Sequence, residues 1–95
     1  MLAFVTVGST RFDALVQAAL SEQVLSALKQ KGYTDLILQC GDSDFDLGQA
    51  LSREQTRRIA VHGLEVEIWR FQPSLQETFE RSDLVISHAG KNHLA

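Results

Sequence analysis

The sequence predicts an α/β fold, a Rossmann-like parallel sheet of about four strands in the order 3-2-1-4 with flanking helices. Short apolar segments rich in β-branched or aromatic residues alternate with segments of helical periodicity, which is typical of parallel sheets with right-handed crossovers. The chain has 95 residues, of which 44% are hydrophobic and 22% charged, so one folded domain is expected. The expected strands are residues 2–7, 35–40, an alternating segment that begins at Leu64, and 83–87.

The first strand leads into two helical segments. It stops at Gly8-Ser9-Thr10, and the next apolar residues recur at the spacing of one helix face, namely Phe12, Leu15, Val16 and Ala19. Thr10, followed three residues later by Asp13, resembles a capping box. A second helix is expected to begin with Ser21 as its N-cap and to end before Gly32, a residue type favoured just after a helix.

The middle of the chain is its most polar part. Residues 42–63 are expected to begin as a loop and to include a short helix at 49–59, where Glu54 and Arg58 would pair one turn apart. Beyond this segment, apolar residues alternate with Glu65 and Glu67. That pattern predicts a strand with one solvated face, lying at the edge of the sheet.

The last helix and strand have clear signals. Ser74-Leu75-Gln76-Glu77 is a capping box, so a short helix carrying Leu75 and Phe79 is expected. The run Leu84-Val85-Ile86 is continuously apolar, as in a strand flanked on both sides. With the chain ending at Ala95, this strand is expected to form an exposed edge that invites aggregation or pairing with another chain.

The expected strand order locates a functional site. The first and fourth strands are neighbours, the winding direction reverses between them, and ligands bind outside the carboxyl ends of strands at such a switch point. Gly8-Ser9-Thr10 and His88-Ala89-Gly90 would flank this crevice. The first segment suits a phosphate, because glycine permits close approach and a helix N-terminus presents unbonded N–H groups; a tight turn with an N-cap is the alternative. His88 is either a donor, acid or base toward a ligand, or a histidine bonded to neighbouring backbone.

Two further motifs are better explained without a function. The segment 42–46 imitates the first half of a calcium loop, but Leu47 replaces the required glycine and Arg53 the bidentate glutamate. A solvated acidic loop is therefore expected, with no metal site and no cofactor. Cys40 ends an apolar strand and is expected to act as a small hydrophobe; a nucleophilic pair with His88 is the alternative.

Composition excludes several classes of protein. With 9 Lys and Arg against 12 Asp and Glu, the formal charge of −3 argues against binding to nucleic acid or to an anionic membrane surface. One cysteine cannot form an internal disulfide, and no apolar run approaches the ~20 residues of a membrane span. The N-terminus lacks the basic region of a signal peptide, so a cytoplasmic location is expected.

Several segments together resemble a known family. They are residues 4–10 (FVTVGST) with Phe12-Asp13, Gly32-Tyr33, Leu38-Gln39 with Gly41, Arg70-Phe71 with Pro73-Ser74-Leu75, and above all residues 82–90 (SDLVISHAG). In this combination the chain is similar to the Alg13-type subunit of UDP-N-acetylglucosamine transferase over nearly all of residues 1–90.

The resemblance implies a GT-B glycosyltransferase that is split between two polypeptides. This chain would be the donor half, which binds UDP-GlcNAc. A membrane-anchored Alg14-type partner would supply the acceptor half and recruit the complex to the cytosolic face of the endoplasmic reticulum. The implied reaction is an inverting transfer of the second GlcNAc to the lipid-linked acceptor GlcNAc-diphosphodolichol, in N-glycan precursor synthesis.

The resemblance also implies site residues and a departure from the family. Donor-side roles fall to six residues, which would hold the diphosphate and stabilise charge on the departing UDP, while no general base is assigned: Gly8, Ser9, Thr10, His88, Ala89 and Gly90. After Gly90 the family continues with a second small-residue turn and further strand–helix units. We therefore expect residues 1–90 to be the N-terminal part of a Rossmann-like donor domain, 91–95 to be a divergent polar tail, and the C-terminally truncated chain to be inactive alone. Two alternatives are a non-catalytic module that binds or regulates the transferase partner, and an unrelated small α/β nucleotide-binding protein.

Overall fold

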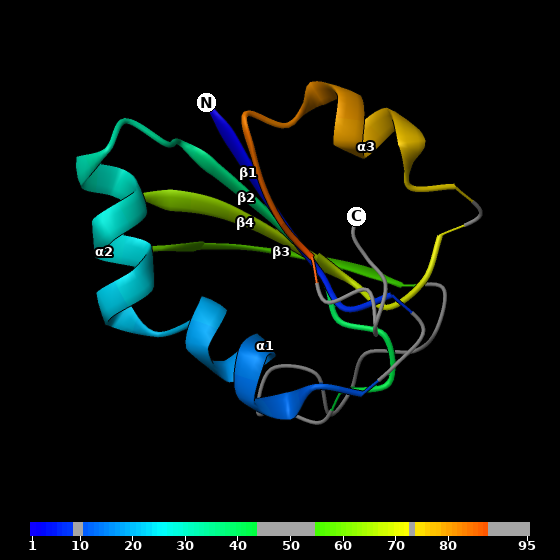
Figure 1. The fold of residues 1–95 in the computed structure, drawn as a ribbon. Coiled ribbons are helices and arrows are strands. Elements are labelled where there is room, and N and C mark those ends of the chain that lie inside the picture. Colours follow the sequence, from blue (N-terminus) through cyan, green and yellow to red (C-terminus); the bar gives the residue numbers. More distant parts are fainter. Residues whose placement is uncertain (9–10, 44–54, 73, 88–95) are drawn as a thin grey trace.

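The structure is a computed structural model that describes residues 1–8, 11–43, 55–72 and 74–87. These residues form one sheet in the order β3-β4-β2-β1-β5. Helices α1 and α2 cover one face of the sheet and α3 lies on the other face (Figure 1). The strands are β1 (Leu2–Thr6), β2 (Asp35–Gln39), β3 (Thr56–Val61), β4 (Leu64–Trp69) and β5 (Leu84–Ser87), and the helices are α1 (Asp13–Ala19), α2 (Glu22–Gln30) and α3 (Gln76–Arg81).

The α/β class predicted from the sequence is confirmed. The four expected strands lie side by side as β4-β2-β1-β5, the predicted order 3-2-1-4, and every pairing among them is parallel. The strand count differs, because β3 pairs antiparallel with β4 and makes the sheet five-stranded and mixed. The prediction that the strand from Leu64 lies at an edge is therefore wrong. Its glutamates are solvated because no helix among the described residues covers that part of the sheet face, and not because the strand is unpaired.

The predicted helix at 49–59 is wrong where the structure describes it, from residue 55 onward. Residues Thr56–Val61 form β3, and Arg58 pairs with Glu67 of the neighbouring strand at 3.1 Å. His62 and Gly63 connect β3 to β4 with φ angles of 50° and 81°. Two successive positive φ angles are typical of the tight turn that joins antiparallel strands. The partner predicted for Arg58, Glu54, lies outside the described residues.

Helix caps agree with the sequence at α2 and differ at α1 and α3. The Ser21 hydroxyl accepts a hydrogen bond from the Val24 N–H at 3.3 Å, and Gly32 follows the end of α2 with a φ of 94°. Helix α1 has Phe12 as its N-cap and no side-chain cap from that residue, while Thr10, the predicted capping residue, lies outside the described residues. The N-cap of α3 is Leu75, one residue later than predicted, again without a side-chain cap.

Among the described residues, two apolar clusters pack on the two faces of the sheet. The larger one lies under α1 and α2 and is built from alternate residues of the parallel strands, such as Val5, Leu38 and Ile68. On the opposite face, Phe4, Ile37 and Trp69 form a smaller cluster. The Phe79 ring of α3 meets the Phe4 ring edge-on at a centroid distance of 5.3 Å. None of the helices in the described ranges is long and apolar enough to cross a bilayer.

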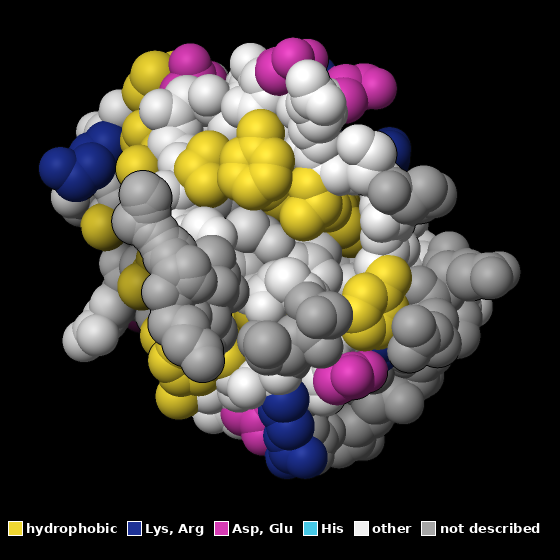
Figure 2. All heavy atoms as spheres, turned by 45° about the vertical axis from the view of Figure 1, so that its right-hand side comes forward, with side chains coloured by type: hydrophobic (Ala, Val, Ile, Leu, Met, Phe, Trp, Pro, Cys, Tyr) yellow, Lys and Arg dark blue, Asp and Glu magenta, His cyan; other side chains and the backbone are white. Residues whose placement is uncertain are grey.

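Strand β5 is tied to the start of the chain and otherwise exposed. The Asp83 N–H donates to the Leu2 carbonyl oxygen and the Leu2 N–H donates to the Asp83 carboxylate, both at 2.8 Å. Val85 and Ile86 point to opposite faces of the sheet and are 38% and 41% exposed. Hydrophobic side chains gather in several groups on the face drawn in Figure 2. The expected exposed edge is confirmed for the part of the chain that the structure describes.

Candidate functional site at the carboxyl edge of the sheet

The carboxyl ends of β1 and β5 lie side by side. Their parallel register pairs Thr6 with Ser87, so the chain leaves the sheet at adjacent positions after both strands. Within the sheet, β2 and β4 lie on one side of β1, and β5 lies on the other side of β1. This reversal makes the edge beyond Thr6 and Ser87 the switch point at which open α/β sheets bind ligands.

Gly8 is the one predicted site residue whose position the structure describes. Its φ is 68°, a left-handed conformation that favours glycine, and a Cβ added there would meet no atom within 4 Å. Its N–H donates to the Gln39 Oε1 at 2.8 Å and approaches the Thr6 hydroxyl at 3.2 Å. This N–H is therefore used inside the protein, and Gly8 contributes its backbone conformation to the site. The other predicted residues, Ser9, Thr10, His88, Ala89 and Gly90, lie outside the described residues.

Gln39 is a central residue of this edge, which the sequence analysis named within the segment Leu38-Gln39 but did not predict as a site residue. Its side chain is buried at the end of β2, with 2% of the residue exposed. The amide oxygen accepts hydrogen bonds from the Gly8 N–H and the Thr6 hydroxyl. The amide nitrogen donates to the carbonyl oxygens of Gly8 at 2.6 Å and Arg70 at 2.5 Å. One side chain thus joins the segments that follow β1 and β4.

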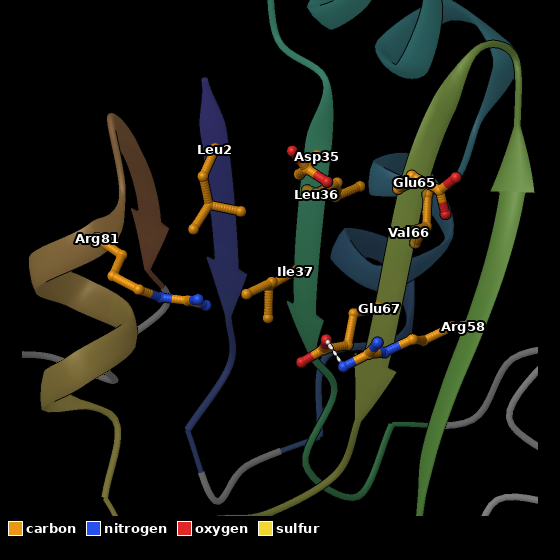
Figure 3. A pocket seen from close by; sticks show the side chains of 9 residues that line it. All are labelled: Leu2, Asp35, Leu36, Ile37, Arg58, Glu65, Val66, Glu67 and Arg81. Atoms are coloured by element: carbon orange, nitrogen blue, oxygen red, sulfur yellow. Dashed lines mark ion pairs between the residues drawn. The ribbon is translucent and has the colours of Figure 1, made fainter.

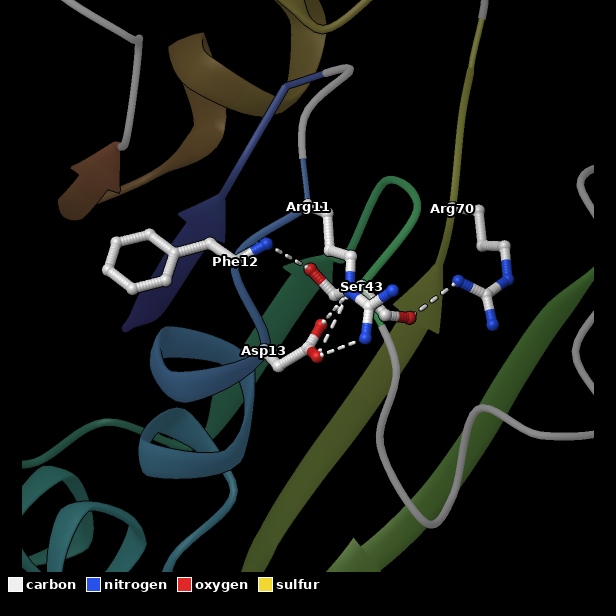
Figure 4. Close-up of polar contacts among 5 residues, drawn as sticks. All are labelled: Arg11, Phe12, Asp13, Ser43 and Arg70. Carbon is white, nitrogen blue, oxygen red and sulfur yellow. Dashed lines mark hydrogen bonds and ion pairs between the residues drawn. The ribbon is translucent and has the colours of Figure 1, made fainter.

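Arg70 and Ser43 extend these contacts to the segments that follow β2 and precede α1. The Arg70 Nη1 donates to the carbonyl oxygens of Gly41 at 3.0 Å and Ser43 at 2.9 Å. The buried Ser43 hydroxyl accepts a hydrogen bond from the Phe12 N–H at 2.8 Å, at the start of α1 (Figure 4). Arg11 and Asp13 form a more exposed ion pair nearby, at 2.8 Å. We call the set Thr6, Gly8, Phe12, Gln39, Ser43 and Arg70 the edge network.

Cys40 and Asp42 lie close to this edge without forming a second reactive site. The Cys40 side chain is fully buried, and burial raises the pKa of its thiol, with the nearby Arg70 acting in the opposite direction. A protonated, buried thiol is a poor nucleophile, which agrees with the expected role of a small hydrophobe. Asp42 is exposed, while residues 44–46 of the calcium-like segment lie outside the described residues. The described part of the chain contains no group of three or more residues suited to hold a metal ion.

A groove of about 510 Å³ lies on the sheet face opposite α1 and α2. The side chains of Arg81 and Arg58 stand at its two ends, and Ile37 and Glu67 lie between them (Figure 3). The groove is lined mainly by the amino-terminal halves of β1, β2 and β4, so it is separate from the carboxyl edge that carries the edge network.

Comparisons with known proteins bear on the family. The description "Glycosyltransferase family 28 C-terminal domain" matches residues 2–95. The chain is 35% identical over 88 residues to the mouse protein named UDP-N-acetylglucosamine transferase subunit ALG13, and 36% identical over 87 residues to the human protein of that name. These alignments cover 93% and 92% of this chain but 7% of each relative.

A shorter relative gives the same indication. The Cryptococcus neoformans (serotype D, strain JEC21) protein with the same name is 30% identical over 109 residues, and the alignment covers 95% of this chain and 54% of the relative. The chain therefore spans about half the length of the fungal relative and a small part of the mammalian ones. No solved structure matches. Since the family description covers almost every residue, the chain belongs to the glycosyltransferase family 28 C-terminal domain family.

Proposed function

We propose that this chain is the donor-binding part of a UDP-N-acetylglucosamine transferase. The observation that carries the proposal is the left-handed turn at Gly8, two residues after Thr6, which pairs with the last residue of β5 at the switch point of the sheet. Such a turn allows the backbone to approach a phosphate closely, and the start of α1 lies a few residues further on. The names of the relatives supply the nucleotide sugar, UDP-GlcNAc.

In this proposal the two segments at the switch point hold the diphosphate of UDP-GlcNAc. Backbone N–H groups and hydroxyls of Ser9 and Thr10, together with residues 88–90, donate to phosphate oxygens, and Gly8 sets the course of the chain. An acceptor hydroxyl attacks the anomeric carbon of GlcNAc and loses its proton, the bond from that carbon to the phosphate oxygen breaks, and UDP departs with the electron pair. Donors aimed at the phosphates stabilise the negative charge that develops on UDP in the transition state.

The proposal extends to a partner and an acceptor. An Alg14-type membrane-anchored subunit provides the acceptor side and brings this chain to the cytosolic face of the endoplasmic reticulum. The acceptor is GlcNAc-diphosphodolichol, and the product carries the second GlcNAc of the N-glycan precursor. The resemblance to Alg13-type subunits supports this part of the proposal.

Calorimetric titration with nucleotides tests the donor site directly. We expect UDP and UDP-GlcNAc to bind, and ADP to bind more weakly. Gly32→Ala is the matched control for Gly8→Ala, because Gly32 also has a positive φ of 94° but lies before the amino end of β2. Both variants lose stability, and only Gly8→Ala is expected to lose affinity for UDP. Preferential binding of ADP or a flavin nucleotide would indicate an unrelated nucleotide-binding protein instead.

Activity is tested with the partner present. The chain is co-expressed with an Alg14-type subunit, and GlcNAc transfer from UDP-GlcNAc is assayed; we expect this chain alone to be inactive. A second candidate function, a non-catalytic module that binds the transferase partner, is favoured by the exposed Val85 and Ile86 on the edge strand β5. Co-precipitation with the partner, combined with an absence of UDP binding, would support that second function.

A further inference from the structure

We propose that Gln39 is a positioning residue for the donor site, whose side-chain amide sets the affinity for the nucleotide diphosphate by fixing the backbone at Gly8. The inference rests on the proposed function, because it assumes that a diphosphate binds where the chain leaves β1. Gln39 is not placed in contact with the ligand. Its effect passes through the two peptide groups of Gly8 that it holds.

The hydrogen bonds of Gln39 account for this role. The side chain uses both ends of its amide on Gly8, accepting from its N–H at 2.8 Å and donating to its carbonyl oxygen at 2.6 Å. Two contacts of opposite kind on one residue fix the orientations of the peptide groups before and after it. Because Gly8 has no Cβ and a positive φ, its own steric preferences restrict the backbone little, so an external contact has to select the conformation.

The remaining contacts of Gln39 connect Gly8 to the rest of the edge network. Its nitrogen also donates to the Arg70 carbonyl oxygen, and the Arg70 guanidinium binds the carbonyl oxygens of Gly41 and Ser43. The Ser43 hydroxyl then accepts from the Phe12 N–H, which lies four residues after Gly8. The chain that crosses the switch point is consequently held on both sides, at Gly8 by Gln39 and at Phe12 by Ser43.

The burial of Gln39 supports a role in orienting the backbone at Gly8. On the same sheet face, the buried residues next to Gln39 are apolar apart from Thr6, which is one of its hydrogen-bond partners: Phe4, Ile37 and Trp69. A buried amide stabilises a fold no better than an apolar side chain unless its groups are bonded, and each unbonded group costs free energy. The described contacts use both the oxygen and the nitrogen of Gln39, all toward β1 and the segments leaving the carboxyl edge. Supporting residues of this kind determine how exactly a binding group is held.

The test compares Gln39→Glu with Gln17→Glu, a matched control on the exposed face of α1. Glutamate keeps the shape of Gln39 but replaces the donor to two carbonyl oxygens by an acceptor. We expect the affinity of Gln39→Glu for UDP to fall about tenfold or more, because the Gly8 carbonyl oxygen loses its donor. Exchange of the Gly8 N–H with solvent should accelerate in Gln39→Met, which also removes the oxygen that accepts from this N–H. Gln17→Glu should change neither quantity. Circular dichroism establishes that each variant is folded under the conditions of the titration.

A pH profile separates positioning from a general loss of stability. As the pH falls and the new carboxyl group protonates, Gln39→Glu regains one donor, so its UDP affinity relative to wild type should recover. Gln39→Met, which removes the amide without adding a charge, should be weak at every pH, and it replaces Gln39→Glu if the latter does not fold. A folded Gln39→Glu or Gln39→Met with wild-type affinity would overturn this inference alone. Failure of the wild-type chain to bind UDP would overturn the proposed function and this inference together.

Discussion

Arg70 is expected to stabilise the fold more than any exposed arginine, and the prediction can be worked out from its contacts. Its Nη1 donates to the carbonyl oxygens of Gly41 and Ser43 at 3.0 and 2.9 Å, and both of these residues are buried. Hydrogen bonds from a charged donor contribute about 1.5–3 kcal/mol each, and here two share one nitrogen. Replacing Arg70 with Met should therefore lower the free energy of unfolding by about 2–4 kcal/mol.

Arg58→Met is the matched control. Arg58 makes an ion pair with Glu67 at 3.1 Å, but its side chain is 77% exposed, and such pairs contribute about 0–1 kcal/mol. Urea unfolding followed by circular dichroism measures both variants. With a dependence on urea of about 1–3 kcal/mol/M, the midpoint of Arg70→Met should fall by an amount on the order of 1 M, while that of Arg58→Met moves little. Equal shifts for the two variants would refute the assignment of Arg70 as the link between the segments at the carboxyl edge.

Three further predictions follow from single residues. Gly8→Ala should destabilise the fold by about 1–2 kcal/mol in urea unfolding, because alanine is strained at a φ of 68°, and Gly8→Asn should cost less, since asparagine tolerates that conformation; equal losses would contradict this. Cys40 should react with a thiol reagent only on unfolding. Burial raises the pKa of the Cys40 thiol in the folded protein. The protonated thiol therefore contributes fully to the free energy of unfolding below about pH 8.5, and this contribution is lost as the pH rises through the pKa of the folded state. Cys40→Ala should not show this loss. Ile86→Lys should reduce any self-association measured by light scattering, because charge on an edge strand blocks strand pairing, whereas lysine at the exposed Gln17 should have no effect.

The parallel part of the sheet could be predicted because each strand carries its own local signal. Residues 2–6, 35–39 and 84–87 are apolar runs with turn residues at their ends, and the α/β alternation then restricts their order to few possibilities. Strand β3 lacked such a signal, since most of its residues are exposed and the spacing of Glu54 and Arg58 suggested a helix. The available clue was the His62-Gly63 pair before an alternating segment, which is typical of a hairpin turn.

The sequence predicted where the candidate site lies, but only some of the residues that build it. The switch point follows from strand order alone, and Gly8 has the conformation expected of a turn that approaches a ligand. Gln39 and Arg70 were named only within the segments that carry the family resemblance and not as site residues, because their partners are about 30 residues away in the sequence, at separations that no local pattern encodes. The signal that existed was chemical: Gln39 is a polar residue directly after the apolar run Leu36-Ile37-Leu38, where a further aliphatic residue would be expected in a buried strand.

The hydrogen bonds between Leu2 and Asp83 also bear on how this sheet assembles. They join residues 81 positions apart, and β1, the first described strand, pairs with β5, the last described strand. Closing so long a loop costs conformational entropy, and only contacts that form after closure compensate for this cost. Chains dominated by pairings between distant residues therefore fold slowly. Until residues 84–87 have been added to a growing chain, one side of β1 therefore lacks the strand with which it pairs in this sheet, and this open side is available for pairing with a wrong strand.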